Sequence, residues 1–137
     1  MVKYICILLV IVSFSCTLPQ DEIPEYPATV AEAAAWVHDN ITWTDTDFFQ
    51  TPEEIYLTRI ADCDGMSYLF MTMLRQNLYI DSTMLTYYVR SAGQGHAVVL
   101  VDGEVWDLTK GEIITVPTDW QLIMSWSWEQ YTVIGIY

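Results

Sequence analysis

Basic residues are scarce in this sequence. Its 137 residues include five Lys and Arg against 18 Asp and Glu, which gives a formal net charge of −13 at pH 7. Such a surface repels the phosphate backbone of DNA and RNA, so nucleic-acid binding is excluded as a function. It also repels an anionic membrane face, so membrane contact requires a lipid or an anchor. A cationic partner fits the charge, although solubility alone also explains it.

Motifs for common cofactors are missing as well. The two histidines, His38 and His96, and the cysteines do not stand at the spacing of a zinc site. No glycine-rich phosphate loop and no dinucleotide fingerprint occurs in the sequence. We therefore expect chemistry that is carried by the side chains of the chain itself.

The apolar run at the N-terminus is too short to span a bilayer. It covers Tyr4–Phe14 after a positive start at Lys3, whereas a spanning helix needs about 20 residues. The layout is typical of a secretory leader, with Ser15 and Cys16 at its end. Because Ser15-Cys16 also resembles a bacterial lipoprotein box, we predict an exported chain, periplasmic or at the cell surface, with Cys16 as a candidate lipid anchor. An ordinary cleaved leader and an uncleaved anchor are the alternatives.

Cysteine is rare, and its placement is informative. Of the three cysteines, Cys6 lies inside the predicted leader and Cys16 ends it, so Cys63 is the only thiol of the predicted mature domain. A lone cysteine in an exported protein is either a small buried hydrophobe or a reactive thiol. A disulfide between Cys16 and Cys63 is disfavoured, because Cys16 would sit on a loose terminus.

The remaining chain divides into a tether and one domain. Residues 17–28 are rich in proline and acidic residues, which predicts an extended tether after a leader over residues 1–16. Residues 29–137 are long enough for one hydrophobic core, and hydrophobic residues make up 53% of the sequence. We therefore predict a single folded domain over residues 29–137.

The first half of this domain predicts three helices. Thr29 and Glu32 form a capping-box pattern, and apolar residues then recur at helical spacing as far as Ile41. The segment Thr51–Glu54 begins a second, short helix, with proline at its first position. A third helix follows Asp62, and its Met-rich apolar stripe is core material.

In the second half of the domain, the apolar residues recur at every second position, as they do in β-strands. This pattern predicts strands at Thr83–Val89, His96–Val101, Glu104–Leu108, Ile113–Val116 and Tyr131–Tyr137. Asp102-Gly103 is the expected tight turn of a hairpin. The stretch that contains Trp120, Trp126 and Trp128 fits neither period. Helices followed by strands predict an α+β fold with an antiparallel sheet.

Cys63 stands at the predicted start of the third helix. The thiolate is the reactive form of cysteine, and an ordinary thiol with a pKa of about 8.5 needs a helix N-terminus or an imidazolium beside it. With Asp62 as the N-cap, the free N–H groups of the first turn would stabilise a thiolate or an oxyanion. Asp62 and Asp64 oppose a further negative charge, so a base must lie close.

His96 and Asp107 are the candidate partners of Cys63. His96 begins a predicted strand, and Asp107 falls roughly opposite it around the Asp102–Gly103 turn. Cross-strand neighbours have Cβ atoms about 5 Å apart, so the carboxylate can orient the imidazole. Each residue alone is more often structural, and only their joint occurrence predicts a Cys–His–Asp site.

Four motifs carry a resemblance to a known family: Thr51-Pro-Glu-Glu, Ala61-Asp62-Cys63-Asp64-Gly65, Gly95-His96-Ala97-Val98-Val99 and Val105-Trp106-Asp107-Leu108-Thr109. Over roughly Thr29–Thr109 the sequence resembles the bacterial transglutaminase-like superfamily, and especially its small periplasmic cysteine-proteinase-like members. The resemblance implies a papain-like core, with the nucleophile at a helix N-terminus and the helices packed on an antiparallel sheet. It implies Cys63 as nucleophile, His96 as general base and acid, and Asp107 as the orienting residue.

The sequence departs from the family pattern at two positions and leaves two roles open. Ala61 stands where the family usually has glycine, and Gly65 where it often has aspartate or an aromatic residue. Gln50 is a candidate for the oxyanion-hole side chain by polarity only. Some members bind calcium near the site, and Asp45 and Asp47 are candidate ligands, although a solvated acidic loop is the simpler interpretation. We predict no cofactor, with calcium as the open alternative.

These features together predict an exported cysteine-dependent amide hydrolase or acyltransferase with a peptide or protein substrate. A thioester would form at Cys63 and would be resolved by water in a peptidase or by an amine in a cross-linking enzyme. The alternative is a catalytically silent transglutaminase-like domain that serves as a protein-binding module at the cell surface. Its contact face would be formed by the tryptophans near the C-terminus.

Overall fold

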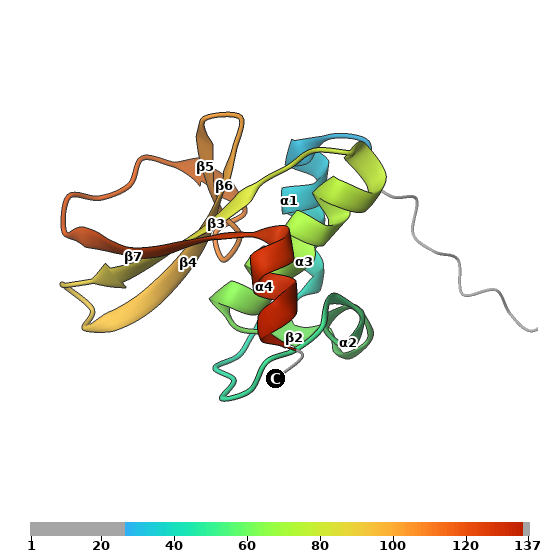
Figure 1. Cartoon of the computed structure of the whole chain (residues 1–137). Helices are drawn as coiled ribbons and strands as arrows, with labels where there is room; N and C mark the ends of the chain where they lie inside the picture. The colour runs from blue at the N-terminus through green and yellow to red at the C-terminus, as the bar shows by residue number, and fades with distance from the viewer. Residues whose placement is uncertain (1–26, 136–137) are drawn as a thin grey trace, which may run out of the picture.

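The computed structural model describes residues 27–135 (Figure 1). The predicted leader and nearly all of the predicted tether lie outside these residues, so both stay predictions. None of the described helices is long and apolar enough to cross a bilayer. The helices are α1 (Val30–Asn40), α2 (Pro52–Thr58), α3 (Cys63–Met73), the π-helix η1 (Leu74–Leu78) and α4 (Trp128–Ile134). The strands are β1 (Thr42–Trp43), β2 (Ile60–Ala61), β3 (Thr83–Val89), β4 (Gln94–Val101), β5 (Glu104–Asp107), β6 (Glu112–Ile114) and β7 (Trp120–Ser127).

The first helices begin where the sequence predicts. At α1, Thr29 Oγ1 accepts the N–H of Glu32 at 3.1 Å, and the Glu32 carboxylate accepts the N–H of Ala28 at 2.8 Å instead of closing a box on Thr29. At α2, Thr51 and Glu54 complete the predicted capping box through bonds of 2.8 and 3.2 Å. These caps satisfy N–H groups that have no acceptor inside the helix, so local chemistry sets each start.

Five antiparallel strands form one sheet in the order β6-β5-β4-β3-β7, which confirms the predicted α+β class. In Figure 1 the helices gather on the right and the sheet extends to the left, so the helices cover only part of it. The predicted hairpin joins β4 to β5. Asp102 and Gly103 have φ values of 49° and 84°, as a two-residue turn of this kind requires.

The predicted strand over Tyr131–Tyr137 is wrong, because the chain forms helix α4 there, and residues 136–137 lie outside the described part. Ser127 and Gln130 form a capping box at its start, through bonds of 2.8 and 3.2 Å. The aromatic and β-branched residues favour a strand, but contacts with α3 override that preference. The preceding stretch, which fits neither period, is the edge strand β7.

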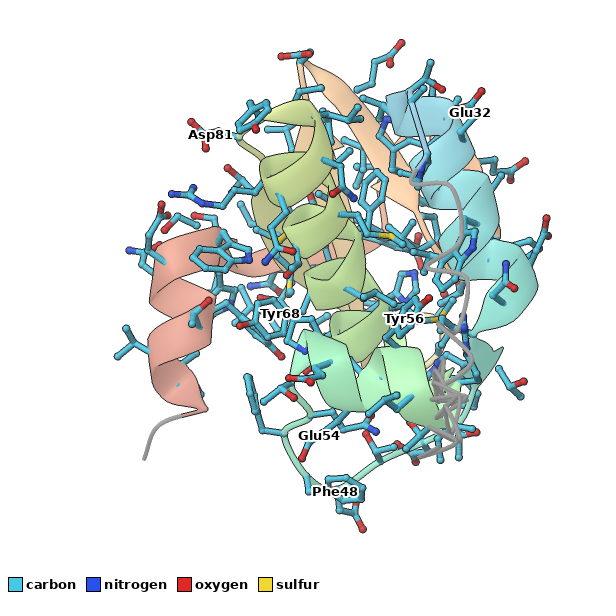
Figure 2. All side chains as sticks on the ribbon, turned by 90° about the vertical axis from the view of Figure 1, so that its right-hand side faces the viewer. Glu32, Phe48, Glu54, Tyr56, Tyr68 and Asp81 are labelled. Atoms are coloured by element: carbon cyan, nitrogen blue, oxygen red, sulfur yellow. The ribbon has the colours of Figure 1, made fainter. Side chains whose placement is uncertain are left out.

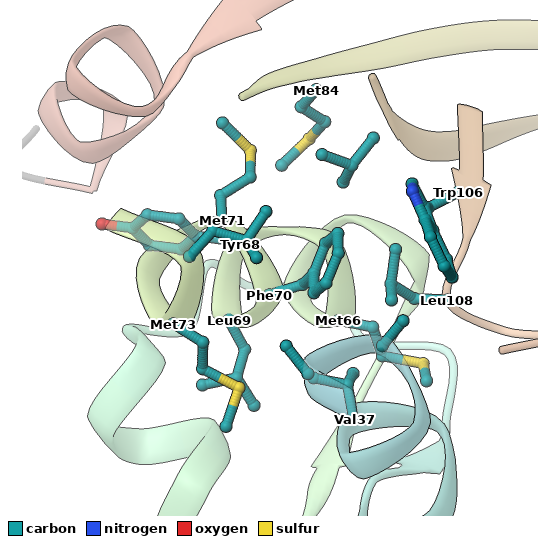
Figure 3. Packing of buried hydrophobic residues seen from close by; sticks show 14 of the residues in the cluster. Val37, Met66, Tyr68, Leu69, Phe70, Met71, Met73, Met84, Trp106 and Leu108 are labelled. Carbon is teal, nitrogen blue, oxygen red and sulfur yellow. The ribbon is translucent and has the colours of Figure 1, made fainter. Parts of the chain in front are cut away.

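Helix α3 forms the centre of the hydrophobic core. Every residue from Gly65 to Met73 is buried. Figure 3 shows Phe70 directed toward Trp106, while Leu69 points toward α2. A helix that is apolar all round is typical of one enclosed by other elements. Its N-terminus is thereby fixed in place, and that is where Cys63 lies.

Helix α4 is fastened to α3 by side-chain hydrogen bonds. Tyr68, which lies between the two helices in Figure 2, donates its hydroxyl to Thr132 Oγ1 at 2.9 Å. Trp128 Nε1 donates to Thr72 Oγ1, also at 2.9 Å. These bonds hold α4 against the middle and the C-terminal part of α3.

Candidate active site

Cys63 is the first residue of α3, as predicted, and its thiol is free and half-buried. Asp62 is the N-cap: its Oδ1 accepts the N–H of Gly65 at 2.9 Å, and its carbonyl accepts the N–H of Met66. Its other oxygen, Oδ2, accepts the hydroxyl of Thr46 at 2.6 Å. With these later N–H groups engaged, the N–H of Cys63 is the first-turn donor that belongs to the predicted nucleophile itself.

The two departures from the family motif meet in one contact. A Cβ at position 65 would lie 3.0 Å from the Cβ of Ala61 and 3.2 Å from Oδ1 of Asp62. A side chain at position 65 would therefore crowd the Ala61 methyl group, the Asp62 cap and Ile55, and glycine avoids this crowding.

His96 and Asp107 form the predicted pair. His96 Nε2 lies 3.1 Å from Asp107 Oδ2. Because Val99 pairs with Trp106, Asp107 lies two residues from the position opposite His96, so the contact is diagonal across the hairpin. Nε2 is engaged by the carboxylate, and Nδ1 is the ring nitrogen that remains for the thiol.

Asp107 is completely buried, and hydrogen bonds compensate for its burial. Its Oδ1 accepts the N–H of Thr109 at 3.1 Å and the Thr109 hydroxyl at 2.7 Å. Burial opposes the charge of Asp107, but the bonds to His96 and Thr109 outweigh it and lower the pKa of the carboxyl. Asp107 therefore carries a fixed negative charge beneath the imidazole.

The imidazole of His96 is correspondingly basic. Burial disfavours its charged form, but the interactions with Asp107 and with Cys63 outweigh burial and raise the pKa of His96 to about 9. His96 is therefore an imidazolium at neutral pH. A positive charge beside the nucleophile is the arrangement that thiol catalysis uses.

Two aromatic residues that the sequence did not reveal complete this environment. Trp120 on β7 meets the His96 ring edge-on, with 5.1 Å between the ring centroids. Tyr131 on α4 donates its hydroxyl to Oδ2 of Asp64, the residue after Cys63. Burial and the neighbouring Asp62 raise the pKa of Asp64. Both aromatics come from the part of the chain whose secondary structure the sequence left open or mispredicted.

Two hollows meet at the predicted nucleophile. One, of about 460 Å³, has Trp43, Asp45 and Thr109 among its lining residues. The other, of about 440 Å³, lies over the sheet. Both are lined by the same four residues: Cys63, Asp64, Gly95 and His96. A bound chain could therefore run from one hollow to the other across the thiol.

No protein-family model matches the chain, and no curated protein sequence matches it. Solved structures of LapG from Legionella pneumophila do match. One has a TM-score of 0.58 at 13% sequence identity, and the calcium-bound structure has a TM-score of 0.56 at 11% identity. The matched part of the chain therefore has a fold similar to that of LapG.

The likeness to LapG has a defined extent. It covers 71% of this chain and 62% of the LapG chain, so this chain spans less than two thirds of LapG. At this level of identity the likeness shows the fold alone. The activity of the present chain therefore has to be argued from its own residues.

Calcium is present in one LapG structure, and another LapG structure is EGTA-treated. In residues 27–135 of the present chain, no group of three or more His, Cys, Asp or Glu side chains could hold a metal ion. Asp45 lines the first hollow, and Asp47 is exposed. Asp62 and Asp64 are already engaged by hydrogen bonds. The described residues offer no assembled calcium site.

Gln50, the candidate oxyanion donor, lies apart from this arrangement. It is buried, and its Oε1 has no hydrogen-bond partner among the described residues. It lines neither of the hollows that contain Cys63. The donor that the geometry offers instead is the backbone N–H of Cys63, which the cap of α3 holds at the start of the helix.

Proposed function

We propose that this protein is an exported, transglutaminase-like cysteine peptidase or acyltransferase that cleaves or transfers an amide of a peptide or protein. Cys63 is the nucleophile, His96 the general base and acid, and Asp107 the orienting residue. The observation that carries the proposal is the 3.1 Å contact of His96 with the buried Asp107, beside Cys63 at a helix N-terminus. The LapG fold supports it.

The first half of the reaction uses the charge pair of Cys63 and His96. The thiolate sulfur attacks the carbonyl carbon of the amide, and the carbonyl π electrons move to oxygen, which gives a tetrahedral oxyanion. The N–H of Cys63 donates to that oxyanion. His96 then gives its proton to the leaving nitrogen, the C–N bond breaks, and a thioester remains on Cys63.

The second half regenerates the thiol site. Neutral His96 takes a proton from water or from an amine while that molecule attacks the thioester carbon. The C–S bond then breaks, and the sulfur leaves as a thiolate beside the imidazolium. Water gives a carboxylic acid and hence a peptidase, and an amine gives a new amide and hence an acyltransferase. Asp107 holds the imidazole in one orientation throughout.

Export belongs to the same proposal. The leader over residues 1–16 delivers the domain to the periplasm or the cell surface, and Cys16 is the site of a lipid or other anchor. Membrane contact then arises only through this anchor, because the domain itself carries a strong negative charge. Labelling with radioactive palmitate, compared between the wild type and Cys16→Ser, tests this part.

The competing function is a silent binding module. Such a module has no need of a buried carboxylate that fixes the orientation of a histidine next to a free thiol, and burying Asp107 has an energetic cost. The intact pair therefore favours catalysis over binding alone.

The deciding experiment measures alkylation of Cys63 by iodoacetamide as a function of pH. The full chain is used, and peptide mass spectrometry reads Cys63 separately from Cys6 and Cys16. We expect rapid labelling at pH 6 and about a 100-fold loss of the pH 6 rate in His96→Ala, since an ordinary thiol is then barely ionised. EGTA and added calcium are tested in the same assay.

Identical pH profiles in the wild type and His96→Ala, both rising near pH 8.5 as for an ordinary thiol, would rule out the catalytic proposal and leave the binding module.

A further inference from the structure

The hollow over the sheet differs chemically from its neighbour across Cys63. Its remaining walls come from β3, β4, β7 and α4 and are mostly apolar: Tyr87, Ala97, Ile123, Met124, Trp126 and Tyr131. Ile123 and Met124 have exposed fractions of 60% and 45%. Large apolar side chains kept in contact with water beside a reactive pair mark a binding surface.

A β-bulge creates this surface. Thr86 pairs with Met124 and Tyr87 pairs with Leu122, so Ile123 is an extra residue without a partner on β3. In a regular strand, successive side chains point to opposite faces. The bulge breaks this alternation, and both Ile123 and Met124 line the same hollow. Bulges are used next to active sites to redirect side chains in this way.

The hollow on the other side of Cys63 is acidic. Asp45, Asp62 and Asp64 line it, and the one cationic side chain among its lining residues is His96, which is already paired with Asp107. A peptide that crosses the thiol must place its next residues there. Asp or Glu at those positions would be repelled, whereas Lys or Arg would be attracted.

The outer edge of β7 suits an extended chain. Within the described residues, β7 pairs only with β3, so the backbone groups on its other side are unpaired by any strand. Such an edge can accept an extended peptide through main-chain hydrogen bonds, while side-chain pockets give the specificity.

We propose, on the basis of the proposed function, that the substrate is an extended peptide. On one side of the scissile bond, this peptide places a bulky apolar side chain in the Ile123–Met124 hollow. On the other side it carries a basic residue over Asp45 and Asp62. The apolar contact selects the substrate, and the charge sets its direction across Cys63.

Matched electrophilic peptides test this specificity. Tripeptide chloromethyl ketones extend from the thiol on the acyl side, and N-iodoacetyl tripeptides extend on the amine side. Each series carries Leu, Ala, Lys or Asp nearest the reactive carbon. Labelling of Cys63 in the full chain is measured at pH 9, where an ordinary thiol is already mostly ionised. Every rate is divided by the iodoacetamide rate of the same variant.

We expect one series to prefer Leu over Ala by about 10-fold and the other to prefer Lys over Asp by a similar factor. Ile123→Ser should abolish the preference for Leu. Leu122→Ser is the matched control, because Leu122 is on the same strand with an exposed fraction of 53% but does not line the hollow. It should change the preference by less than about 2-fold.

Equal rates for Leu and Ala in both series would overturn the proposal, as would equal effects of Ile123→Ser and Leu122→Ser. Labelling that slows as the protein concentration rises would assign the hollow to a second copy of the chain and would also overturn it. A failure of the proposed function gives a different result: the pH profile of iodoacetamide labelling is then the same in the wild type and in His96→Ala. The peptide preference at pH 9 can survive that failure.

Discussion

Residues 29–109 and residues 110–135 both contribute to the environment of Cys63, but their structures are encoded differently. In the first region, α1, α2 and α3 begin at side-chain caps and the hairpin turns on Asp102-Gly103. In the second region, β7 is an edge strand and α4 follows it directly. The first region supplies the reactive residues and the second supplies the walls around them. Local signals thus fix the chemistry, and tertiary contacts shape the space for a substrate.

The largest expected effect comes from a substitution in the hydrophobic core of residues 29–109. Phe70 on α3 is fully buried against Trp106, with the ring centroids 6.3 Å apart. Phe70→Ala should lower the free energy of unfolding by about 4 kcal/mol, because it removes the ring and leaves a cavity. Urea unfolding measures the loss. Leu57→Ala on α2 is the control: Leu57 has an exposed fraction of 73%, so we expect a change of less than about 0.5 kcal/mol. Equal effects would mean that α3 is not the centre of the core.

The next effect concerns the charge pair of the hairpin. Asp107→Asn should lower the free energy of unfolding by about 3 kcal/mol near pH 6, because it leaves His96 charged without its carboxylate. Folding raises the pKa of His96 from 6.5 to about 9, so its contribution is complete below pH 6.5 and is lost as the pH rises through 9. Folding lowers the pKa of Asp107, so its contribution is present above 3.8 and is lost in more acidic solution.

The stability difference between the wild type and Asp107→Asn should therefore be greatest between about pH 4 and 6.5 and should shrink toward pH 9 and above. Urea titrations of both proteins at four pH values measure it. A difference that is constant over this range would show that the two residues are not coupled.

The sequence predicted the parts of the fold that depend on short-range chemistry. Asp62 is the cap of α3, and the hairpin brings His96 to Asp107, both as predicted. The predicted pairing of His96 with Asp107 was two residues off, because the two-residue turn at Asp102-Gly103 places Asp107 opposite Val98. The contacts of Tyr131 with Asp64 and of Trp120 with His96 could not be found, since both depend on how α4 and β7 pack.

The error at residues 131–137 has a specific physical reason. Tyr131, Thr132 and Val133 favour strands, but this preference is weak and depends on what the side chains pack against. In the structure, Tyr131 packs against Phe49 and Tyr68, which come from distant parts of the sequence. The Ser127–Gln130 capping box is a local signal for a helix, and the strand prediction did not take it into account.

Two tyrosines of one aromatic cluster allow residues 29–109 and residues 110–135 to be compared directly. Tyr131 donates to the carboxylate of Asp64, and Tyr68 donates to the neutral hydroxyl of Thr132. Hydrogen bonds to charged groups are the stronger kind, so Tyr131→Phe should cost about 2 kcal/mol and Tyr68→Phe about 1 kcal/mol in unfolding free energy.

Thermal and urea unfolding compare the two variants, and the rings retained in each exclude a cavity effect. Equal losses in Tyr131→Phe and Tyr68→Phe would mean that the bond between α4 and Asp64 has no special strength, and that α4 is held by packing alone.

The smallest expected effect comes from removing the N-cap of α4, and it tests whether this helix depends on its capping box. Ser127→Ala removes the side chain that accepts the N–H of Gln130, and Thr51→Ala removes the same bond at α2. Caps of this kind contribute about 1 kcal/mol each. If tertiary contacts dominate in residues 110–135, Ser127→Ala should cost less than Thr51→Ala in urea unfolding, because bonds from Tyr68 and Trp128 still fasten the helix. A larger loss for Ser127→Ala would show that α4 is encoded locally, like the helices of the first region.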